Sequence, residues 1–407
     1  MSNTFKTLAD GDIVRIMLDS FHNKSVFLNT INKDHEKDFA KDRHKNGGTI
    51  LIKNPNEYIV GTGAVISTQA ITETTQPMTV ATQKNIPVTI TSYERSMSLD
   101  DFQEEVADPA MARLTAEIEY YTLSQVYKKI FNLTGTPATT PASLTAITNA
   151  GVKLTQGLAP EDNRHLLLDP VAMGAVQGSV AAYFHKQSEI EKAFQKGYLG
   201  EAQGFAWHQS AMVPTHTNGT RTDATPVVNT STGITSGSST ITTTGQTNAQ
   251  TLCAGDVFTI QDVYAINRET KQRYSHLQQF VVLTAMTCDA TDDIVVSPTP
   301  YTSGAQQNVE IVSAGSGKAI VHVASGGSGA ASAVYTQNLA YHKDFCTFAT
   351  APLPLPYGDK GAMATYDNIT MRMWQFSDGI NDSHTTRFDV LFGFLVQRPE
   401  FAVRVRG

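Results

Sequence analysis

The stretch from Ile369 to Gly407 alternates apolar and polar side chains, and this alternation limits the possible folds more than any other feature of the chain. A polar break at 378–382 and a proline at Pro399 divide it into three segments. The alternating apolar residues are Ile369, Met371 and Met373; Phe388, Val390, Phe392, Phe394 and Val396; and Phe401, Val403 and Val405. Because successive side chains of a β-strand point to opposite faces, each segment is expected to be a strand. The stretch is interpreted as architectural.

The composition narrows the class of protein. The chain has 407 residues, enough for roughly two or three domains with a substantial core. Only 17% of the residues are charged, below the usual quarter or so, which suits a surface largely covered by other chains. The net charge of -7 argues against a module that binds duplex DNA through a basic surface.

The three cysteines, Cys253, Cys288 and Cys346, are widely spaced and form no CxxC pair, so they are expected to be reduced thiols. No apolar run approaches the ~20 residues of a membrane-spanning helix. No secretory signal is recognisable at the start of the sequence. The sequence therefore predicts a protein that is soluble and intracellular where it is made, with no membrane contact.

The first part of the chain has the character of an arm followed by a ribbon. Residues 1–48 contain a short amphipathic pattern and then a dense run of charges, which fits either a solvated helix or an arm that docks on a partner. Residues 49–92 are rich in Thr, Val and Ile, and a turn is expected at 83–85. Such a two-stranded ribbon is marginally stable alone and is expected to need a partner surface.

The middle of the chain predicts helices and a buried strand. The Asp108-Pro109 pair suits the start of a long helix that is expected to run to Gly135, roughly 37 Å at 1.5 Å per residue. In the following α/β layer, 166–168 is a buried strand and Asp169-Pro170 starts a helix to about residue 184. A further helix is expected at 188–195.

From residue 217 the composition changes to Thr, Ser and Gly, with short apolar strands after it. The expected strands are 257–260, 280–283, 294–296, 309–312 and 320–323. Their spacing predicts a small β-barrel, and the glycine-rich run at 326–329 is expected to be its exit linker. Residues 222–336 would then be an insertion into the main fold.

Residue types suited to chemistry occur without a catalytic pattern. His342 and Asp344 could supply two metal ligands, but zinc sites use three or more. The acidic pairs at 100–101 and 104–105 fit the first turn of a helix, where carboxylates complement the helix dipole. The acidic residues of 289–293 lack the register of a calcium loop, and GxSxG and phosphate-loop motifs are absent. The sequence predicts no enzyme, no cofactor and no metal site.

The order of these parts resembles the major capsid proteins of tailed double-stranded DNA phages, which share the Johnson fold. The similarity is greatest to coat proteins of short-tailed phages that carry an inserted β-barrel. The segments that carry it, colinear over nearly all 407 residues, are Gly47-Gly48-Thr49-Ile50; Glu94 through Leu99-Asp100-Asp101-Phe102; Arg164-His165-Leu166-Leu167-Leu168-Asp169-Pro170; Ala254-Gly255-Asp256-Val257-Phe258-Thr259-Ile260 through Gln278-Gln279-Phe280-Val281-Val282; and Phe388-Asp389-Val390-Leu391-Phe392-Gly393 with Arg398-Pro399-Glu400.

This resemblance implies an α+β fold made of the parts found in such coat proteins. They are an N-terminal arm (1–48), an extended β-ribbon loop (49–92), a peripheral domain with a spine helix (93–135), an axial α/β domain (136–221), an inserted β-barrel (222–336) and a return to the axial and peripheral domains (337–407).

The same resemblance implies a structural protein of the virion that assembles in the host cytoplasm. The implied partners are further copies of the chain in hexamers and pentamers, a separate scaffolding protein, a portal protein, and enclosed double-stranded DNA that is bound without sequence specificity. No proteolytic processing is expected. The candidate intersubunit contacts are Glu57, Lys84, Glu94, Arg95, Arg398 and Glu400, each of which could equally be a solvated surface residue.

Two other classes of protein remain open from the sequence. An encapsulin-like compartment would share the fold and enclose an enzyme, although such shells are usually built from shorter subunits without an inserted barrel. A secreted β-rich binding or adhesion protein would explain the segment rich in Thr, Ser and Gly. The missing signal and the long helix count against that class.

Overall fold

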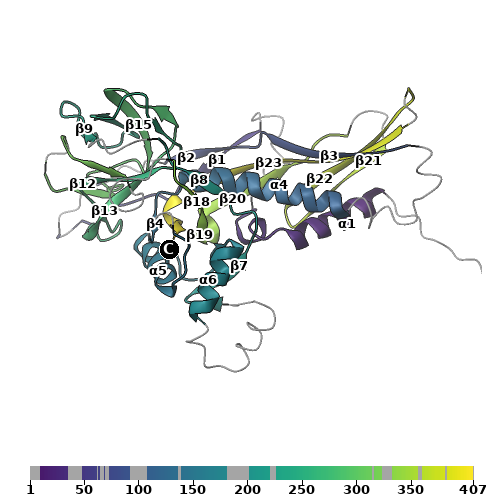
Figure 1. Cartoon of the computed structure of the whole chain (residues 1–407), viewed down its shortest axis with the longest axis horizontal. Coiled ribbons are helices and arrows are strands. Elements are labelled where there is room, and N and C mark those ends of the chain that lie inside the picture. The colour runs from purple at the N-terminus through teal and green to yellow at the C-terminus, as the bar shows by residue number, and fades with distance from the viewer. Residues whose placement is uncertain are drawn as a thin grey trace, which may run out of the picture. The chain divides into compact units, whose positions relative to one another are not determined.

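The computed structural model describes the chain in segments that fall into two compact units (Figure 1). The described residues are 10–34, 48–61, 63–64, 68, 73–91, 108–135, 139–180, 201–220, 226–313, 316–322, 332–355, 360–380 and 383–406. Unit 1 contains 1–53, 75–122 and 346–395, and unit 2 contains 54–74, 123–345 and 396–407. No helix in these described segments is long and apolar enough to cross a membrane.

The centre of unit 1 is strand β23 (Ser383–Val396), the longest of a five-stranded sheet. The strand order is β20 (Cys346–Ala351), β23, β22 (Ile369–Asp378) and β21 (Lys360–Tyr366), and β3 (Thr82–Thr91) also pairs with β23. Figure 1 shows β3, β22 and β23 running alongside one another. Between β21 and β22 the chain reverses at Asp367 and Asn368, which both have positive φ (48° and 59°), as a tight primed hairpin turn requires.

The period-two pattern of the carboxy-terminal stretch is confirmed as three strands. Phe388, Val390 and Phe392 of β23 are fully buried. The third strand, β24 (Ala402–Val405), belongs to a different sheet, because the 3-10 turn Pro399–Phe401 separates it from β23. One alternating sequence thus supplies strands to both units.

Helix α1 (Asp10–Lys24) packs against β21 and β22 in unit 1. Its buried residues Val14, Met17, Leu18 and Phe21 follow the spacing of one helical face, which confirms an amphipathic helix in the first 48 residues. The charged run that follows lies mostly outside the described residues, as do the acidic pairs at 100–101 and 104–105 and the expected helix at 188–195.

The expected turn at 83–85 is wrong. Strand β3 continues through these residues and pairs with β23 from Thr82↔Phe392 to Thr91↔Ser383. Strand β2 (Thr75–Thr79) instead pairs with β1 (Thr49–Lys53), and the direction of the chain changes at 80–81. Polar residues at 83–85 suggested a break, but a long partner strand provides hydrogen bonds to their backbone, and that pairing outweighs local propensity.

The β1–β2 pair is supported by side chains from elsewhere in unit 1. Ile52, Met78 and Val80 form an apolar cluster with Ala349 and Ala351 of β20. This packing provides the support that an isolated two-stranded ribbon lacks.

The predicted start of the long helix is confirmed, but its predicted end is wrong. Helix α4 runs from Asp108 to Val126, a 3-10 turn covers Tyr127–Lys129, and the chain then forms strand β4 (Leu133–Thr134). Strand β4 pairs in parallel with β24, and the backbone N–H of Leu133 donates to the Gln279 side chain (2.8 Å). These long-range bonds compete with continuation of the helix and end it nine residues before Gly135.

Unit 2 contains a six-stranded sheet in the order β4, β24, β19 (Asn338–His342), β5 (Arg164–Leu168), β7 (Phe205–Gln209) and β6 (Glu201–Ala202). The expected strand at 166–168 is confirmed as part of β5, and its leucines are buried. The expected helix start is also confirmed: helix α6 (Pro170–Val180) is capped by Asp169, whose carboxylate accepts from the N–H of Ala172 (3.1 Å). Sequence reasoning missed helix α5 (Leu144–Gln156), although Ser143 caps it.

The second sheet of unit 2 contains every strand expected between 257 and 323. Its order is β16 (Val309–Ile311), β12 (Val257–Ile266), β13 (Arg273–Val282), β15 (Thr291–Ser297), β10 (Thr240–Thr244) and β9 (Val227–Val228), with β17 (Ile320–His322) also on β12. The segment before β17 bonds back to β9: Val228 N–H donates to the Lys318 carbonyl (2.9 Å) and Ile320 N–H to the Pro226 carbonyl (2.8 Å). The hydrogen-bonded path therefore returns to its first strands around one apolar core.

Gly393 of β23 marks the closest backbone crossing in unit 1. A Cβ at this position would lie 2.3 Å from the Thr79 carbonyl oxygen and 2.8 Å from the Val80 Cα. Gly393→Ala is therefore expected to lower the free energy of unfolding by about 1–3 kcal/mol, because backbone atoms must shift. Urea unfolding of the purified subunit, followed by circular dichroism, measures the change.

The matched control is Gly174→Ala in helix α6, where a Cβ would meet nothing within 4 Å. This change is expected to stabilise by about 0.4–1 kcal/mol, since alanine favours the helix. Equal effects of the two substitutions would contradict the close crossing at Gly393.

Candidate functional site

The residues that could have bound a metal make structural contacts instead. Among the described residues, no group of three or more His, Cys, Asp or Glu side chains could hold a metal ion. The Asp344 N–H donates to His342 Nδ1 (3.2 Å), and burial lowers the pKa of His342. The neutral imidazole thus accepts a backbone hydrogen bond. His342 and Asp344 form a turn contact, with Nδ1 to carboxylate at 3.8 Å.

The acidic run at 289–293 is also structural. The Asp292 carboxylate accepts from the N–H of Asp289 (2.9 and 3.1 Å), and burial raises its pKa. Asp293 accepts from the hydroxyl of Thr242 on the neighbouring strand β10 (2.7 Å). These carboxylates hold a strand end in place.

Two of the six candidate contact residues bind the same arginine. In unit 2, Arg268 donates through Nη1 to Glu400 (3.1 Å) and through Nη2 to Glu57. All three side chains are partly buried. The pairing joins the 54–74 segment, the β12–β13 turn and the 3-10 turn at 399–401. Sequence reasoning did not single out Arg268, because 211 residues separate it from Glu57 and no local pattern marks it.

Of the other four candidates, Lys84 and Arg398 are described by the structure and Glu94 and Arg95 are not. Lys84 of β3 forms an ion pair with Glu117 of α4 (2.8 Å) and lies over the Tyr121 ring. The Arg398 guanidinium lies 5.0 Å from the centre of the Phe401 ring. Glu94 and Arg95 belong to the part of the chain that is not described.

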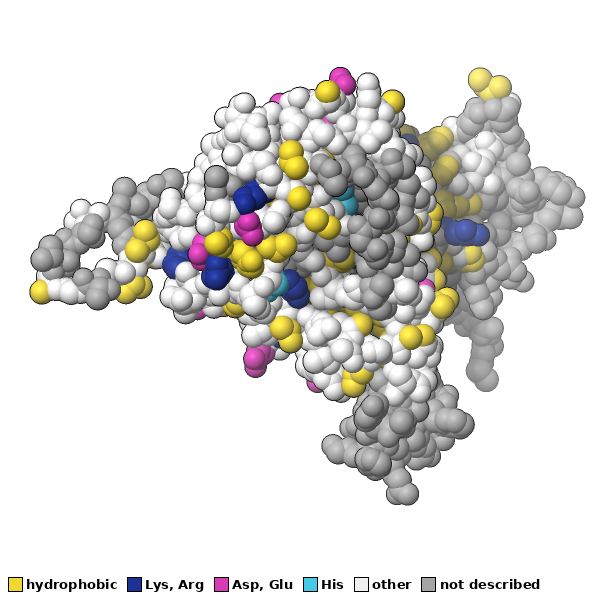
Figure 2. Space-filling model, turned by 60° about the vertical axis from the view of Figure 1, so that its left-hand side comes forward, with side chains coloured by type: hydrophobic (Ala, Val, Ile, Leu, Met, Phe, Trp, Pro, Cys, Tyr) yellow, Lys and Arg dark blue, Asp and Glu magenta, His cyan; other side chains and the backbone are white. Residues whose placement is uncertain are grey.

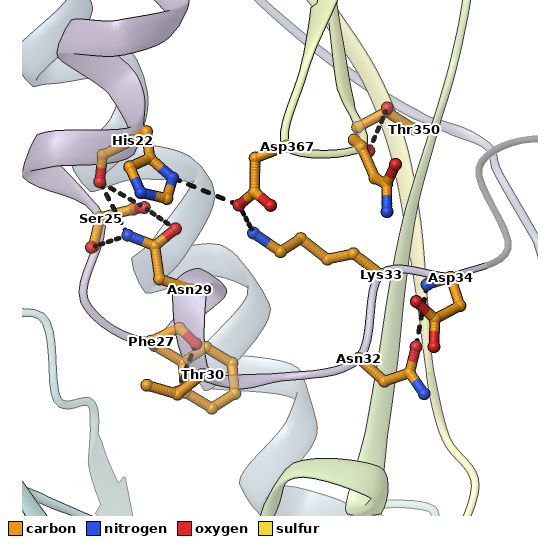
Figure 3. Close-up of polar contacts among 11 residues, drawn as sticks. His22, Ser25, Phe27, Asn29, Thr30, Asn32, Lys33, Asp34, Thr350 and Asp367 are labelled. Carbon is orange, nitrogen blue, oxygen red and sulfur yellow. Dashed lines mark hydrogen bonds and ion pairs between the residues drawn. The ribbon is translucent and has the colours of Figure 1, made fainter.

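A carboxylate at the β21–β22 turn holds the amino-terminal segment in unit 1 (Figure 3). Asp367 accepts from Lys33 and contacts His22 Nδ1 at 3.2 Å. Nearby, the Glu119 carboxylate of α4 accepts from the backbone N–H groups of Val26 (3.0 Å) and Phe27 (3.2 Å). Three donors of this segment, Lys33 and the backbone N–H groups of Val26 and Phe27, are therefore satisfied by two carboxylates from distant parts of the sequence.

A second polar cluster is buried in unit 2, where strand β8 (Thr215–Thr217) pairs with β18 (Val334–Thr336). His216 Nε2 lies 2.9 Å from Asp256, whose other oxygen accepts from the N–H of Gly219 and of Cys253. Arg404 is fully buried and donates to the Gly255 carbonyl (2.8 Å) and to Gln337 (3.3 Å). Burial lowers the pKa of Arg404 to about 9. The cluster therefore connects strand β24 to Gly255 and to Gln337.

Large apolar side chains are exposed on strand β1, on the segment that follows it and on a turn. Val60 is 89% exposed and Tyr58 is 58% exposed on the segment that follows β1, and Leu51 of β1 is 63% exposed. Ile380, in the turn between β22 and β23, is 93% exposed. Exposed groups of this kind typically mark surfaces that other molecules cover.

The charged side chains on the surface are mixed in sign. On the face shown in Figure 2, Lys and Arg lie beside Asp and Glu in small groups, and the described residues form no extended basic field there. This agrees with the net charge of -7 and differs from the clustered basic surface of a duplex-binding module.

The chain is similar to several phage proteins. A 179-residue stretch is 26% identical to the "Major capsid protein" of Acyrthosiphon pisum secondary endosymbiont phage 1 and covers 41% of each chain. The structure is similar to one from Mycobacterium phage Che8 (TM-score 0.49, 12% identity, 93% and 90% of the two chains). It is also similar to the capsid of Cyanophage P-SCSP1u (TM-score 0.45, 11% identity, 89% and 84%).

The match to a family model is far more extensive. The model described as "P22 coat protein - gene protein 5" matches residues 7–407. This span includes nearly all of both units and all six candidate contact residues. The chain belongs to the P22 coat protein family.

Proposed function

We propose that this chain is the major capsid protein of a tailed phage, a structural subunit of an icosahedral shell built from hexamers and pentamers that encloses double-stranded DNA. Membership of the coat protein family carries the proposal. The exposed apolar side chains of the 54–74 segment agree with it, because a shell subunit needs surfaces that close only against further copies. A structural role also fits carboxylates and histidines that are engaged in the fold rather than gathered in a catalytic group.

We further propose that the Johnson-fold parts expected from the sequence apply to this chain. The closed path of strands between 226 and 322 supports an inserted β-barrel within 222–336. The docked amino-terminal segment supports an arm at 1–48, and the β1–β2 pair supports an extended loop at 49–92. The peripheral and axial domains would occupy 93–135 and 136–221, and 337–407 would return to both.

The proposed partners follow from the same role. They are a separate scaffolding protein, a portal protein and packaged DNA that is held without sequence specificity, in a virion assembled in the host cytoplasm. The mixed charge on the face shown in Figure 2 supports this kind of DNA contact, since the described residues of that face offer no basic stripe for tight binding. Lys84 and Arg398 remain proposed contacts with neighbouring copies. Glu57 and Glu400 would act by fixing the loop and turn that carry such contacts.

Electron microscopy of the protein expressed alone and together with the product of the neighbouring gene tests the proposal. Closed shells, or spirals and tubes that become closed shells on coexpression, are expected. A stable monomer or small oligomer in both preparations would contradict the capsid assignment.

Val60→Asp tests whether the exposed loop is an assembly surface. A charge buried in an interface without a partner is strongly unfavourable. The yield of closed shells is therefore expected to fall at least about tenfold, which corresponds to a penalty of about 1.4 kcal/mol or more per contact. The melting temperature of the free subunit should not change, because Val60 is exposed there.

The control is Val60→Thr, which preserves the shape of the side chain without adding a charge. It is expected to assemble nearly as well as the wild-type protein. Normal shells from Val60→Asp would show that this side chain is not part of a subunit contact.

Arg268→Gln tests the bonds that hold Glu57 and Glu400. The three side chains are partly exposed, so the loss of both ion pairs is expected to lower the free energy of unfolding by only about 1 kcal/mol at low salt. Urea unfolding measures the stability of both proteins at about 0.1 M and about 0.5 M salt. The difference in unfolding free energy between wild type and Arg268→Gln should shrink at the higher salt, because screening weakens the ion pairs.

Arg113→Gln is the control, because Arg113 is exposed on α4 and has no ion pair with a described residue. It is expected to change the stability by less than about 0.5 kcal/mol. An effect of Arg268→Gln as small as that of Arg113→Gln would mean that the double ion pair adds nothing to stability.

A further inference from the structure

One pocket of unit 2 has a lining that the shell function does not explain. It lies between helix α5 and strands β12 and β13, has a cavity volume of about 80 Å³ and opens to solvent. Lys153 and Gln156 of α5 line one side of it, and Tyr274 and His276 of β13 line the other. Glu400 and Arg268 are also part of the wall.

Lys153 is the charged group of the pocket that lacks a counter-ion. The described residues provide no ion pair to its ammonium group, and burial lowers its pKa to about 8. The carboxylate of Glu400 is bonded to Arg268, and Arg268 is also bonded to Glu57. These three side chains carry one net negative charge, but both carboxylates are bonded to Arg268 and neither forms an ion pair with Lys153.

The wall beside Lys153 is held in place by contacts of its own. The Tyr274 and His276 rings stack, with centroids 5.4 Å apart and planes at 15°. The Tyr274 hydroxyl donates to the Gln156 carbonyl (3.3 Å), which ties β13 to the end of α5. Burial and the nearby Lys153 charge lower the pKa of His276 to about 4. The neutral imidazole can therefore donate one hydrogen bond into the pocket without adding a second charge.

From this geometry we propose that the pocket binds a small oxyanion, a sulfate, phosphate or carboxylate group, with Lys153 as its counter-ion. A bound anion would compensate the charge of the Lys153 ammonium group, which burial otherwise disfavours. It would also connect α5 to the β12–β13 pair across the pocket. The proposal does not depend on shell formation, because it concerns a single subunit.

The probe is sulfate, whose charge does not change between pH 7 and pH 10. Because sulfate binds the protonated amine more tightly, the pKa of Lys153 must be higher in the bound state than in the free state. Binding should therefore be strongest below the free pKa of about 8 and should weaken as the pH rises. An increase of about one pKa unit on binding corresponds to roughly tenfold weaker binding at pH 10 than at pH 7.

The pKa is read directly by NMR of the ¹³C-dimethylated lysines of the purified subunit, with the Lys153 signal assigned from Lys153→Arg. Chloride at matched ionic strength is the control. The expected result is a Lys153 pKa near 8 in chloride and at least about one unit higher in saturating sulfate. A Lys153 pKa that is the same in both salts would overturn the proposal.

Variants give an independent measurement through the sulfate-dependent increase in melting temperature. Lys153→Met should lose the part of the increase that exceeds the general effect of sulfate, and Lys153→Arg should keep it. Lys129→Met removes an exposed lysine of a 3-10 turn and should behave as wild type. Sulfate responses that are equal in all four proteins would mean an adventitious ion only and would refute the site.

Discussion

The buried carboxylate of Asp389 holds the sheet of unit 1 together. It lies on the central strand β23 and accepts from Arg372 of β22 (Nε, 3.2 Å), from Gln83 of β3 (3.1 Å) and from Arg387 of its own strand (2.7 Å). Breaking a buried pair by removing one partner typically costs about 3–5 kcal/mol, because the remaining charge stays buried. The bonds therefore favour one register of β3, β23 and β22, since a shift by one residue would move Asp389 to the opposite face.

The sequence could predict those parts of the fold that depend on local patterns. The alternation around Phe388 determines which side chains β23 buries, and a period of two needs no distant information. The Asp169-Pro170 pair starts α6 because the cap and the missing N–H act within one helical turn. The strands of the second sheet were recognisable in the same way, as short apolar runs between turn residues.

What the sequence could not predict depends on pairing between distant residues. The polar residues at 83–85 predict a turn, but pairing with β23 keeps them in a strand. The local sequence around Leu133 predicts a helix, but its bonds to β24 and Gln279 place it in a strand. The candidate charges show the same limit. The sequence predicts Glu57 and Glu400 as candidate intersubunit contacts, but Arg268, which binds both, has no sequence pattern that distinguishes it from other arginines.

Arg404 shows how the chain uses its polar groups. A fully buried guanidinium with a pKa lowered to about 9 is unfavourable compared with an apolar side chain, since desolvation penalises its charge. Its bonds to Gly255 and Gln337 act on segments that flank the second sheet of unit 2, and apolar packing alone would not choose among alternative positions of those segments. Buried charge thus contributes specificity at the expense of stability, while apolar side chains such as Val60 and Ile380 remain exposed. That distribution suits a subunit that reaches its full stability only in contact with further copies.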